Sequence, residues 1–133
     1  MKLTFLVGLP GSGKTWLGQR MAVEGAIFLD DLSKLGGLDY LSDFLSTIPD
    51  QDVVIADIFL CESPYREKVQ TIIASYGLEV EWIFFENNLV KCMHNLAFRW
   101  KQGDKREVRA ITRKLSKTYT IPEDVTVRSI VLA

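Results

Sequence analysis

The sequence has few of the residues and patterns that mark several protein classes. Its 133 residues include two cysteines, Cys61 and Cys92, which are too few for a disulfide framework and lack the spacing of zinc ligands. No apolar run approaches the roughly 20 residues that span a bilayer, which excludes a transmembrane protein. The N-terminal segment does not have the pattern of a signal peptide, because its short apolar stretch continues directly into a glycine loop. We therefore expect a cytoplasmic protein without a membrane partner.

Length, composition and charge are consistent with one domain, expected to span residues 1–133. This length supports one hydrophobic core and is too short for two. The hydrophobic content of 47% and the charged content of 25% are ordinary for a globular protein. The net charge of −1 conceals an asymmetry: residues 30–62 carry eight acids and one base, whereas residues 91–117 carry nine bases and two acids. Two solvated faces of opposite sign would explain this, and so would a basic lid that handles phosphates.

Short apolar segments alternate with helical patterns along the chain. Strands are expected at 3–7, 26–29, 52–57, 78–85 and 125–132, and helices at 13–23, 38–48, 63–77, 89–100 and 107–118. Ser63 is the expected N-cap of its helix, with Pro64 at the first helical position. The alternation predicts an α/β fold in which helices cover both faces of a five-stranded parallel sheet.

The segment GLPGSGKT, from Gly8 to Thr15, fits the phosphate-loop pattern G-x-x-x-x-G-K-[S/T] between a strand and a helix. Its glycines let backbone amides turn inward around a phosphate at a helix N-terminus, where the dipole favours anions. Lys14 is expected to reach the β- and γ-phosphates, and the Thr15 hydroxyl to bind Mg²⁺. ATP and Mg²⁺ are therefore the expected cofactors. The candidate nucleotide-binding residues are Gly8, Pro10, Gly11, Ser12, Gly13, Lys14, Thr15, Trp16, Arg99 and Arg106.

Three acids end two of the expected strands. Asp57 closes the strand at 52–57, where an acid that holds Mg²⁺ or the acceptor belongs. Asp30 and Asp31 close the strand at 26–29, and the carboxyl ends of parallel strands converge on a ligand crevice. A carboxylate there can act as general base toward an attacking hydroxyl or orient it. Which of the two aspartates is the base stays open, as does a simple turn or helix cap made by the pair.

Taken in order, these elements resemble a known family. GLPGSGKTWL, FLDDL, VVIADIFL and the pattern C-x-x-N-x-x-x-R formed by Cys92, Asn95 and Arg99 are similar to the kinase domain of bacteriophage-type polynucleotide kinases. More broadly, they look like the P-loop kinases of the adenylate kinase-like group. The likeness runs from about residue 1 to about residue 124. It implies a three-layer P-loop NTPase fold with sheet order 2-3-1-4-5 and a short basic helical lid.

The resemblance also implies roles for single residues. Asp30 matches the acid that activates the acceptor 5′-hydroxyl, and Asp57 matches the acid that helps place the acceptor end. Arg99 matches the lid arginine that stabilises charge on the transferring phosphoryl group, so Lys14, Asp30 and Arg99 are the expected catalytic residues. An acceptor-contacting arginine of that family is replaced here by Ser33, beside which Lys34 is a candidate acceptor ligand. The segment between the second aspartate and Asp57 is also shorter than in that family.

The sequence therefore predicts an ATP-dependent kinase that moves the γ-phosphate of ATP to an acceptor hydroxyl. A polynucleotide 5′-hydroxyl is the leading acceptor, and a nucleoside, nucleotide or other small molecule is the alternative. The acidic segment at 30–62 favours the alternative, because a long nucleic acid is bound through basic contacts. A P-loop ATPase or nucleotide-binding switch remains a further interpretation of the loop.

Overall fold

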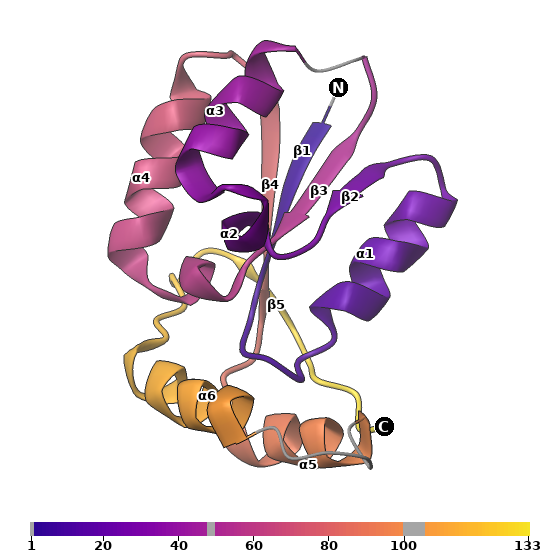
Figure 1. Ribbon diagram of the computed structural model, residues 1–133, viewed down its shortest axis with the longest axis vertical. Helices are drawn as coiled ribbons and strands as arrows, with labels where there is room; N and C mark the ends of the chain where they lie inside the picture. Colours follow the sequence, from indigo (N-terminus) through magenta and orange to yellow (C-terminus); the bar gives the residue numbers. More distant parts are fainter. Residues whose placement is uncertain (1, 48–49, 100–105) are drawn as a thin grey trace.

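The computed structural model of the chain, which describes residues 2–47, 50–99 and 106–133, contains a single all-parallel sheet (Figure 1). Its strands are β1 (Lys2–Val7), β2 (Ile27–Leu29), β3 (Val53–Ala56), β4 (Glu79–Phe85) and β5 (Thr126–Arg128). They lie in the order β2-β3-β1-β4-β5, which confirms the expected order. The α-helices are α1 (Lys14–Val23), α2 (Leu32–Leu35), α3 (Gly37–Ser46), α4 (Ser63–Ala74), α5 (Leu89–Arg99) and α6 (Arg106–Thr118), and η1 (Ile58–Cys61) is a 3₁₀ helix.

Alternating side chains of the central strands build two hydrophobic layers. Leu3 and Phe5 of β1 belong to the larger core, against which partly buried side chains of α3 pack. Leu6 of β1 points to the opposite layer, where Leu17 and Met21 of α1 pack on it. Both faces of the sheet are therefore covered, as a parallel sheet requires, and the molecule has three layers with α3 and α4 on one side and α1 on the other (Figure 1).

Helices α5 and α6 lie beyond the carboxyl ends of the strands (Figure 1). Tyr119, which follows α6, donates its hydroxyl to the carbonyl oxygens of Val7 at 3.3 Å and Phe85 at 2.6 Å. These two residues end β1 and β4, so the phenol ties the helical pair to the sheet beside the phosphate loop. Leu115 on α6 is buried, whereas Arg106 and Lys117 of the same helix are exposed.

Several local predictions differ from the structure. Ser63 is the first helical residue of α4 and Glu62 occupies the N-cap position, so the predicted cap is one residue too late. The last strand covers 126–128 rather than 125–132, because β5 pairs with only three residues of β4 before the chain leaves the sheet. The short helices α2 and η1 were not predicted, since four residues are too few to display a helical period.

Some predictions lie outside the described residues. They are residue 48 of the helix expected at 38–48 and residue 100 of the helix expected at 89–100. The first of these helices ends before its predicted end, at Ser46, with Thr47 in the C-cap position. Within the described ranges, none of the helices combines the length and the apolar character that a membrane crossing requires.

Candidate functional site

The loop between β1 and α1 has a backbone that only glycine adopts easily. Gly11 and Gly13 have φ of 85° and 109°, in the left-handed region. A Cβ on Gly11 would lie 2.6 Å from the carbonyl oxygen of Cys92, so α5 passes too close for any side chain there. The loop ends at the N-terminus of α1, where unpaired backbone amides and the helix dipole attract an anion. The segment therefore has the form of a phosphate-binding loop.

Lys14 lies at the first position of α1 and is buried against the loop. Its Nζ donates to the carbonyl oxygens of Gly8 at 2.5 Å and Leu9 at 3.0 Å. Burial lowers the pKa of the Lys14 ammonium from its usual value. An ammonium has three donors, and these two bonds account for two of them, so one N–H remains for a phosphate oxygen.

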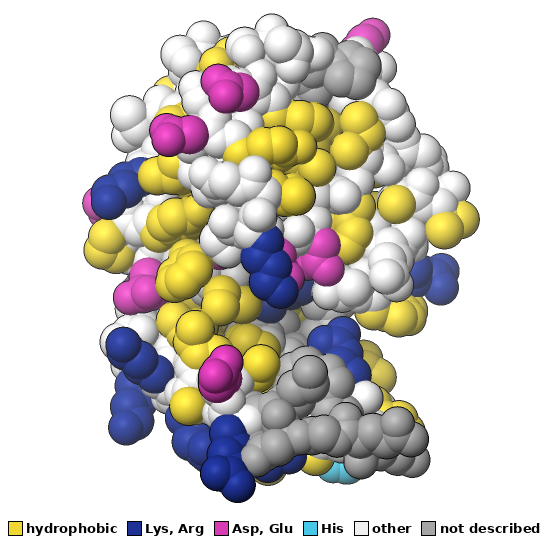
Figure 2. Space-filling model, in the orientation of Figure 1, with side chains coloured by type: hydrophobic (Ala, Val, Ile, Leu, Met, Phe, Trp, Pro, Cys, Tyr) yellow, Lys and Arg dark blue, Asp and Glu magenta, His cyan; other side chains and the backbone are white. Residues whose placement is uncertain are grey.

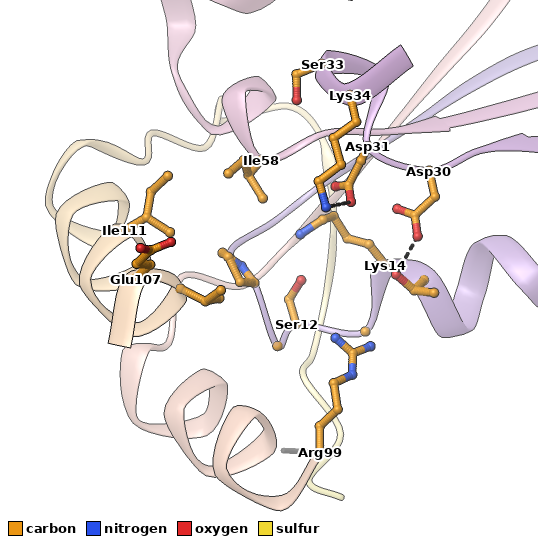
Figure 3. Close-up of a pocket in the computed structure, with 15 residues that line it drawn as sticks. Ser12, Lys14, Asp30, Asp31, Ser33, Lys34, Ile58, Arg99, Glu107 and Ile111 are labelled. Carbon is orange, nitrogen blue, oxygen red and sulfur yellow. Dashed lines mark hydrogen bonds and ion pairs between the residues drawn. The ribbon is translucent and has the colours of Figure 1, made fainter. Parts of the chain in front are cut away.

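The acids after β2 meet the end of the loop. The Thr15 hydroxyl donates to Oδ2 of Asp30 at 3.1 Å, across 15 positions of sequence (Figure 3). Asp31 has φ of 54°, which is unusual for a residue with a side chain, and its Oδ2 lies 3.3 Å from Nζ of Lys34. Because β2 and β1 are parallel, their carboxyl ends deliver Asp30 and Thr15 to the same edge.

A cavity of about 380 Å³ opens at this edge. Its lining consists of Pro10, Gly11, Ser12, Gly13, Lys14, Thr15, Asp30, Asp31, Ser33, Lys34, Ile58, Arg99, Glu107, Val108 and Ile111. The loop forms one wall, the segment after β2 another, and α6 contributes Glu107 and two apolar side chains (Figure 3). Figure 2 shows acidic and basic side chains side by side in the hollow of this face, with hydrophobic side chains around them.

Arg99, at the end of α5, extends its guanidinium toward the loop (Figure 3). It lines this cavity and also a second one, so it lies between the two. Arg106 is the first residue of α6, is exposed and lines neither cavity. Arg109 and Arg113 of the same helix also line neither cavity. The structure thus brings Arg99 to the loop and leaves the other three arginines outside both cavities.

The second cavity, of about 410 Å³, lies on the other side of the loop. It is lined by Gly11, Ser12, Gly13, Trp16, Phe85, Asn95, Arg99, Arg128, Ser129, Val131, Leu132 and Ala133. The Trp16 ring is 55% exposed and the Arg20 guanidinium lies 5.0 Å from its centre. The combination of aromatic and aliphatic walls with two guanidinium groups suits a flat, partly polar ligand that continues from the loop.

Asn95 closes the second cavity by joining three parts of the chain. Its Nδ2 donates to the carbonyl oxygens of Gly11 at 3.0 Å and Val131 at 2.9 Å, and its Oδ1 accepts from the Ala133 amide at 2.8 Å. The helix α5, the phosphate loop and the C-terminal residues are therefore fastened by one side chain.

Asp57 is buried and lines neither cavity. Its carboxylate is on a residue that is 1% exposed and does not line the first cavity. Oδ2 accepts from the Ser33 amide at 2.6 Å, and Oδ1 accepts from the Phe59 amide at 2.8 Å. The expected metal or acceptor role of Asp57 therefore has no counterpart in its contacts within the described chain.

Sequence reasoning did not single out several residues of the two cavities. Glu107, Val108 and Ile111 reach the first cavity from α6, and Arg128 reaches the second. Arg128 ends β5, so the same strand-end argument that selected the aspartates would have found it. The three cavity residues of α6 are not marked by any sequence pattern, because the approach of this helix to the sheet depends on tertiary packing.

Comparison with known proteins identifies the fold. The sequence matches no protein-family model and no curated protein. In structure the chain is similar to a gluconokinase from Sinorhizobium meliloti 1021, with TM-score 0.67 and 13% identity over 99% of this chain and 84% of that chain. It is also similar to Kti12 of Chaetomium thermophilum in complex with ADP-AlF3, with TM-score 0.66 and 14% identity over 96% of this chain and 88% of that chain. A third is the APS kinase CysC of Mycobacterium tuberculosis in complex with AMPPNP and APS, with TM-score 0.62 and 16% identity over 96% and 87% of the two chains.

At these identities the similarity establishes the fold and nothing finer. The five-stranded parallel sheet in the order 2-3-1-4-5, with helices around it, is the P-loop NTPase fold.

Proposed function

We propose that the protein is an ATP-dependent phosphotransferase that moves the γ-phosphate of ATP to an acceptor hydroxyl. The observation that carries the proposal is the 3.1 Å contact between the Thr15 hydroxyl and the Asp30 carboxylate, in a cavity shared with the phosphate loop. An acid at this position is what a kinase needs beside the transferring phosphate, whereas simple nucleotide binding does not need it. The similarity in fold to proteins named as a gluconokinase and an APS kinase supports the same conclusion.

The donor half of the site would hold ATP across the two cavities. The amides of the loop and the ammonium of Lys14 would bind the β- and γ-phosphates. The base and ribose would enter the second cavity, where the Trp16 ring offers a surface for stacking. Arg99, between the cavities, would neutralise the charge that spreads over the phosphoryl oxygens during transfer.

The acceptor half would occupy the first cavity beyond the loop. The acceptor oxygen attacks the γ-phosphorus, the bond from that phosphorus to the β,γ-bridging oxygen breaks, and ADP leaves with the electron pair. The acceptor proton passes to a carboxylate, for which Asp30 is the first candidate and Asp31 the second, since both line the cavity. Lys34, held near Asp31, is available to orient the acceptor.

Magnesium fits the oxygen donors present at the loop. The Thr15 hydroxyl and the Asp30 carboxylate lie together, and Mg²⁺ is commonly held by one or two protein oxygens in addition to phosphates and water. When bound, the ion supplies neutralisation of phosphate charge. The described residues contain no group of three or more His, Cys, Asp or Glu side chains suited to a metal, so a dedicated all-protein cage is not part of the proposal.

The acceptor can be of two kinds. The resemblance to polynucleotide kinases makes a nucleic acid 5′-hydroxyl the first to test. A small hydroxylated molecule is the second, and the lining of the first cavity favours it. The three acids of the lining offset its three bases, so this cavity has no excess of basic charge for a phosphodiester chain, whereas Ile58 and Ile111 suit an uncharged ligand.

Transfer of label from γ-labelled ATP tests the proposal. The protein is incubated with Mg²⁺ and a panel of acceptors: 5′-hydroxyl DNA and RNA oligomers, nucleosides, nucleoside monophosphates and sugars. Label on an oligomer end supports the polynucleotide acceptor, and label only on a monomer supports the small-molecule acceptor. Free phosphate without any labelled acceptor contradicts the kinase and supports a hydrolytic switch.

A further inference from the structure

The buried carboxylate of Asp57 joins two segments that are far apart in sequence. Its Oδ2 accepts from the Ser33 amide at 2.6 Å, 24 residues away, and its Oδ1 accepts from the Phe59 amide at 2.8 Å. With the residue 1% exposed, the carboxylate is shielded from water and its charge is stabilised by these two amides. The Asp57 carboxylate therefore links the backbone at Ser33 to the backbone at Phe59.

The first of these partners belongs to the segment that carries the acids of the site. Ser33 is the second residue of α2, where a helix amide has no partner within its own helix. Asp31 stands at the N-cap of α2 and forms no capping bond with its side chain. Asp57, which follows β3, therefore caps α2 in place of Asp31. The capped amide lies two residues from Asp31, whose φ of 54° is unfavourable for an aspartate unless the surrounding structure holds it.

The second partner belongs to the opposite wall of the same cavity. Phe59 lies in η1, of which Asp57 is the N-cap residue, and Ile58 of η1 lines the first cavity. Ser33 lines that cavity from the side of α2. The Asp57 carboxylate thus fixes the distance between the segment after β2 and the segment after β3. Both segments line the cavity proposed for the acceptor.

We propose that Asp57 is a positioning residue for phosphoryl transfer. Its carboxylate holds the turn of Asp30 and Asp31 at the phosphate loop. In this interpretation Asp57 neither binds magnesium nor contacts the acceptor. The inference rests on the proposed kinase function. Two observations support it: both Asp57 oxygens accept hydrogen bonds from backbone amides, and the carboxylate bonded to Thr15 at the loop belongs to Asp30.

The Asp57→Asn variant tests the inference, since an amide keeps the size of the carboxylate but can accept only one of the two bonds. The maximal rate of transfer should fall about 100-fold, the effect expected of a small displacement of catalytic groups. The Mg²⁺ concentration for half-maximal activity and the affinity for Mg·ADP should not change. Asp52→Asn, an acid-to-amide change at the other end of β3 where Asp52 accepts from the Lys2 amide, is the matched control and should transfer at the wild-type rate.

A readout that needs no transfer is hydrogen exchange of the Ser33 amide. In Asp57→Asn this amide should exchange about tenfold faster or more, because it loses a hydrogen bond to a charged group. If the variant does not fold, the wild-type protein with added Mg·ADP serves instead. A positioning role keeps the Ser33 amide protected in that complex, whereas a carboxylate that turns to the metal would release it.

Transfer by Asp57→Asn at the wild-type rate would overturn the inference. So would an Asp57→Asn variant that needs a higher Mg²⁺ concentration for half-maximal activity and recovers the full rate at saturating Mg²⁺. Loss of protection of the Ser33 amide when Mg·ADP binds to the wild-type protein would also overturn it. Absence of transfer by the wild-type protein to every acceptor contradicts the proposed function instead. The protection of Ser33 is measured without any acceptor, so the two failures are distinguishable.

Discussion

The Asn95 side chain donates to the carbonyl oxygen of Gly11 at 3.0 Å, across 84 positions of sequence. The same side chain bonds the C-terminal residues Val131 and Ala133. The rigidity of the phosphate loop on this side therefore depends on α5 as well as on the turn itself. Nucleotide binding should respond to changes in a helix that lies outside the loop motif.

Replacement of Asn95 by leucine should weaken nucleotide binding about tenfold. Three hydrogen bonds are lost, each with a net value of about 0.5–1.5 kcal/mol, and the Gly11 and Val131 carbonyl groups lose a donor. Mg·ATP binding is measured by calorimetry and stability by urea unfolding. Val90→Ala, at an 80% exposed position of the same helix, is the control. An unchanged affinity in Asn95→Leu would show that the contact has no part in shaping the loop.

Alanine at Gly11 should be far more damaging than alanine at Gly25. Both glycines have positive φ, 85° and 110°, so both substitutions cost about 1 kcal/mol in backbone strain. A Cβ at Gly11 would also meet the Cys92 carbonyl oxygen at 2.6 Å, whereas nothing lies within 4 Å of one at Gly25. We expect a loss of about 3 kcal/mol or more for Gly11→Ala from the added overlap. Equal free energies of unfolding in urea for the two variants would contradict this.

Asp30→Asn should abolish phosphoryl transfer while leaving ATP bound. Loss of the proton acceptor is expected to lower kcat by about 10²–10⁴-fold, since the amide cannot take the acceptor proton. Lys14→Ala should impair both binding and transfer, because we expect its ammonium to bind the β- and γ-phosphates. Parallel assay of Asp31→Asn decides which aspartate is the base, and Asp43→Asn, at an exposed position of α3, is the control. Normal transfer by Asp30→Asn would assign the proton transfer to another group.

Stability should fall as the pH rises from about 9 to about 11. Burial raises the pKa of Cys61 and of Cys92 to about 11, from an ordinary value of 9.0. The folded state then holds these protons more tightly than the unfolded chain. Their contribution is intact below pH 9 and is lost through this window. Two pH units on one thiol correspond to about 2–3 kcal/mol.

Urea unfolding at pH 8, 9, 10 and 11 under reducing conditions measures this dependence. The lowered pKa of Lys14 acts in the opposite direction, and the raised pKa of Tyr119 acts in the same direction. The comparison must therefore be made against Cys61→Ala and Cys92→Ala, each of which should have a shallower decline than the wild type. Parallel declines in all three proteins would mean that the thiols do not contribute.

Local patterns of the sequence predicted the strand segments and the phosphate loop, whereas the order of the strands was implied only by the resemblance to P-loop kinases. Continuous apolar runs identified the buried parallel strands, and the glycine spacing identified the loop between β1 and α1. These features depend on local patterns, which a sequence displays directly. The strand-end argument also predicted that Asp30 lies at the crevice of the phosphate loop, where it accepts a hydrogen bond from Thr15.

The same argument gave an incomplete account of Asp57. It correctly located this residue at the carboxyl end of β3, but a strand end does not say where a side chain points. The orientation of Asp57 toward the Ser33 and Phe59 amides depends on α2 and η1, two helices of four residues each that leave no period in the sequence. Short elements of this kind are stabilised by their tertiary contacts and not by local propensity.

By itself, the sequence determined that Lys14 and Thr15 belong to a loop of the phosphate-binding type, because this loop needs only glycine, lysine and threonine at fixed spacing. The tertiary structure decided which side chains surround that loop. Arg99 reaches the loop while Arg106 does not, and α6 contributes Glu107 to the cavity, because helix packing brings them there. Contacts between residues distant along the chain arise from the burial of shared apolar surface, and such packing is not encoded in any single segment.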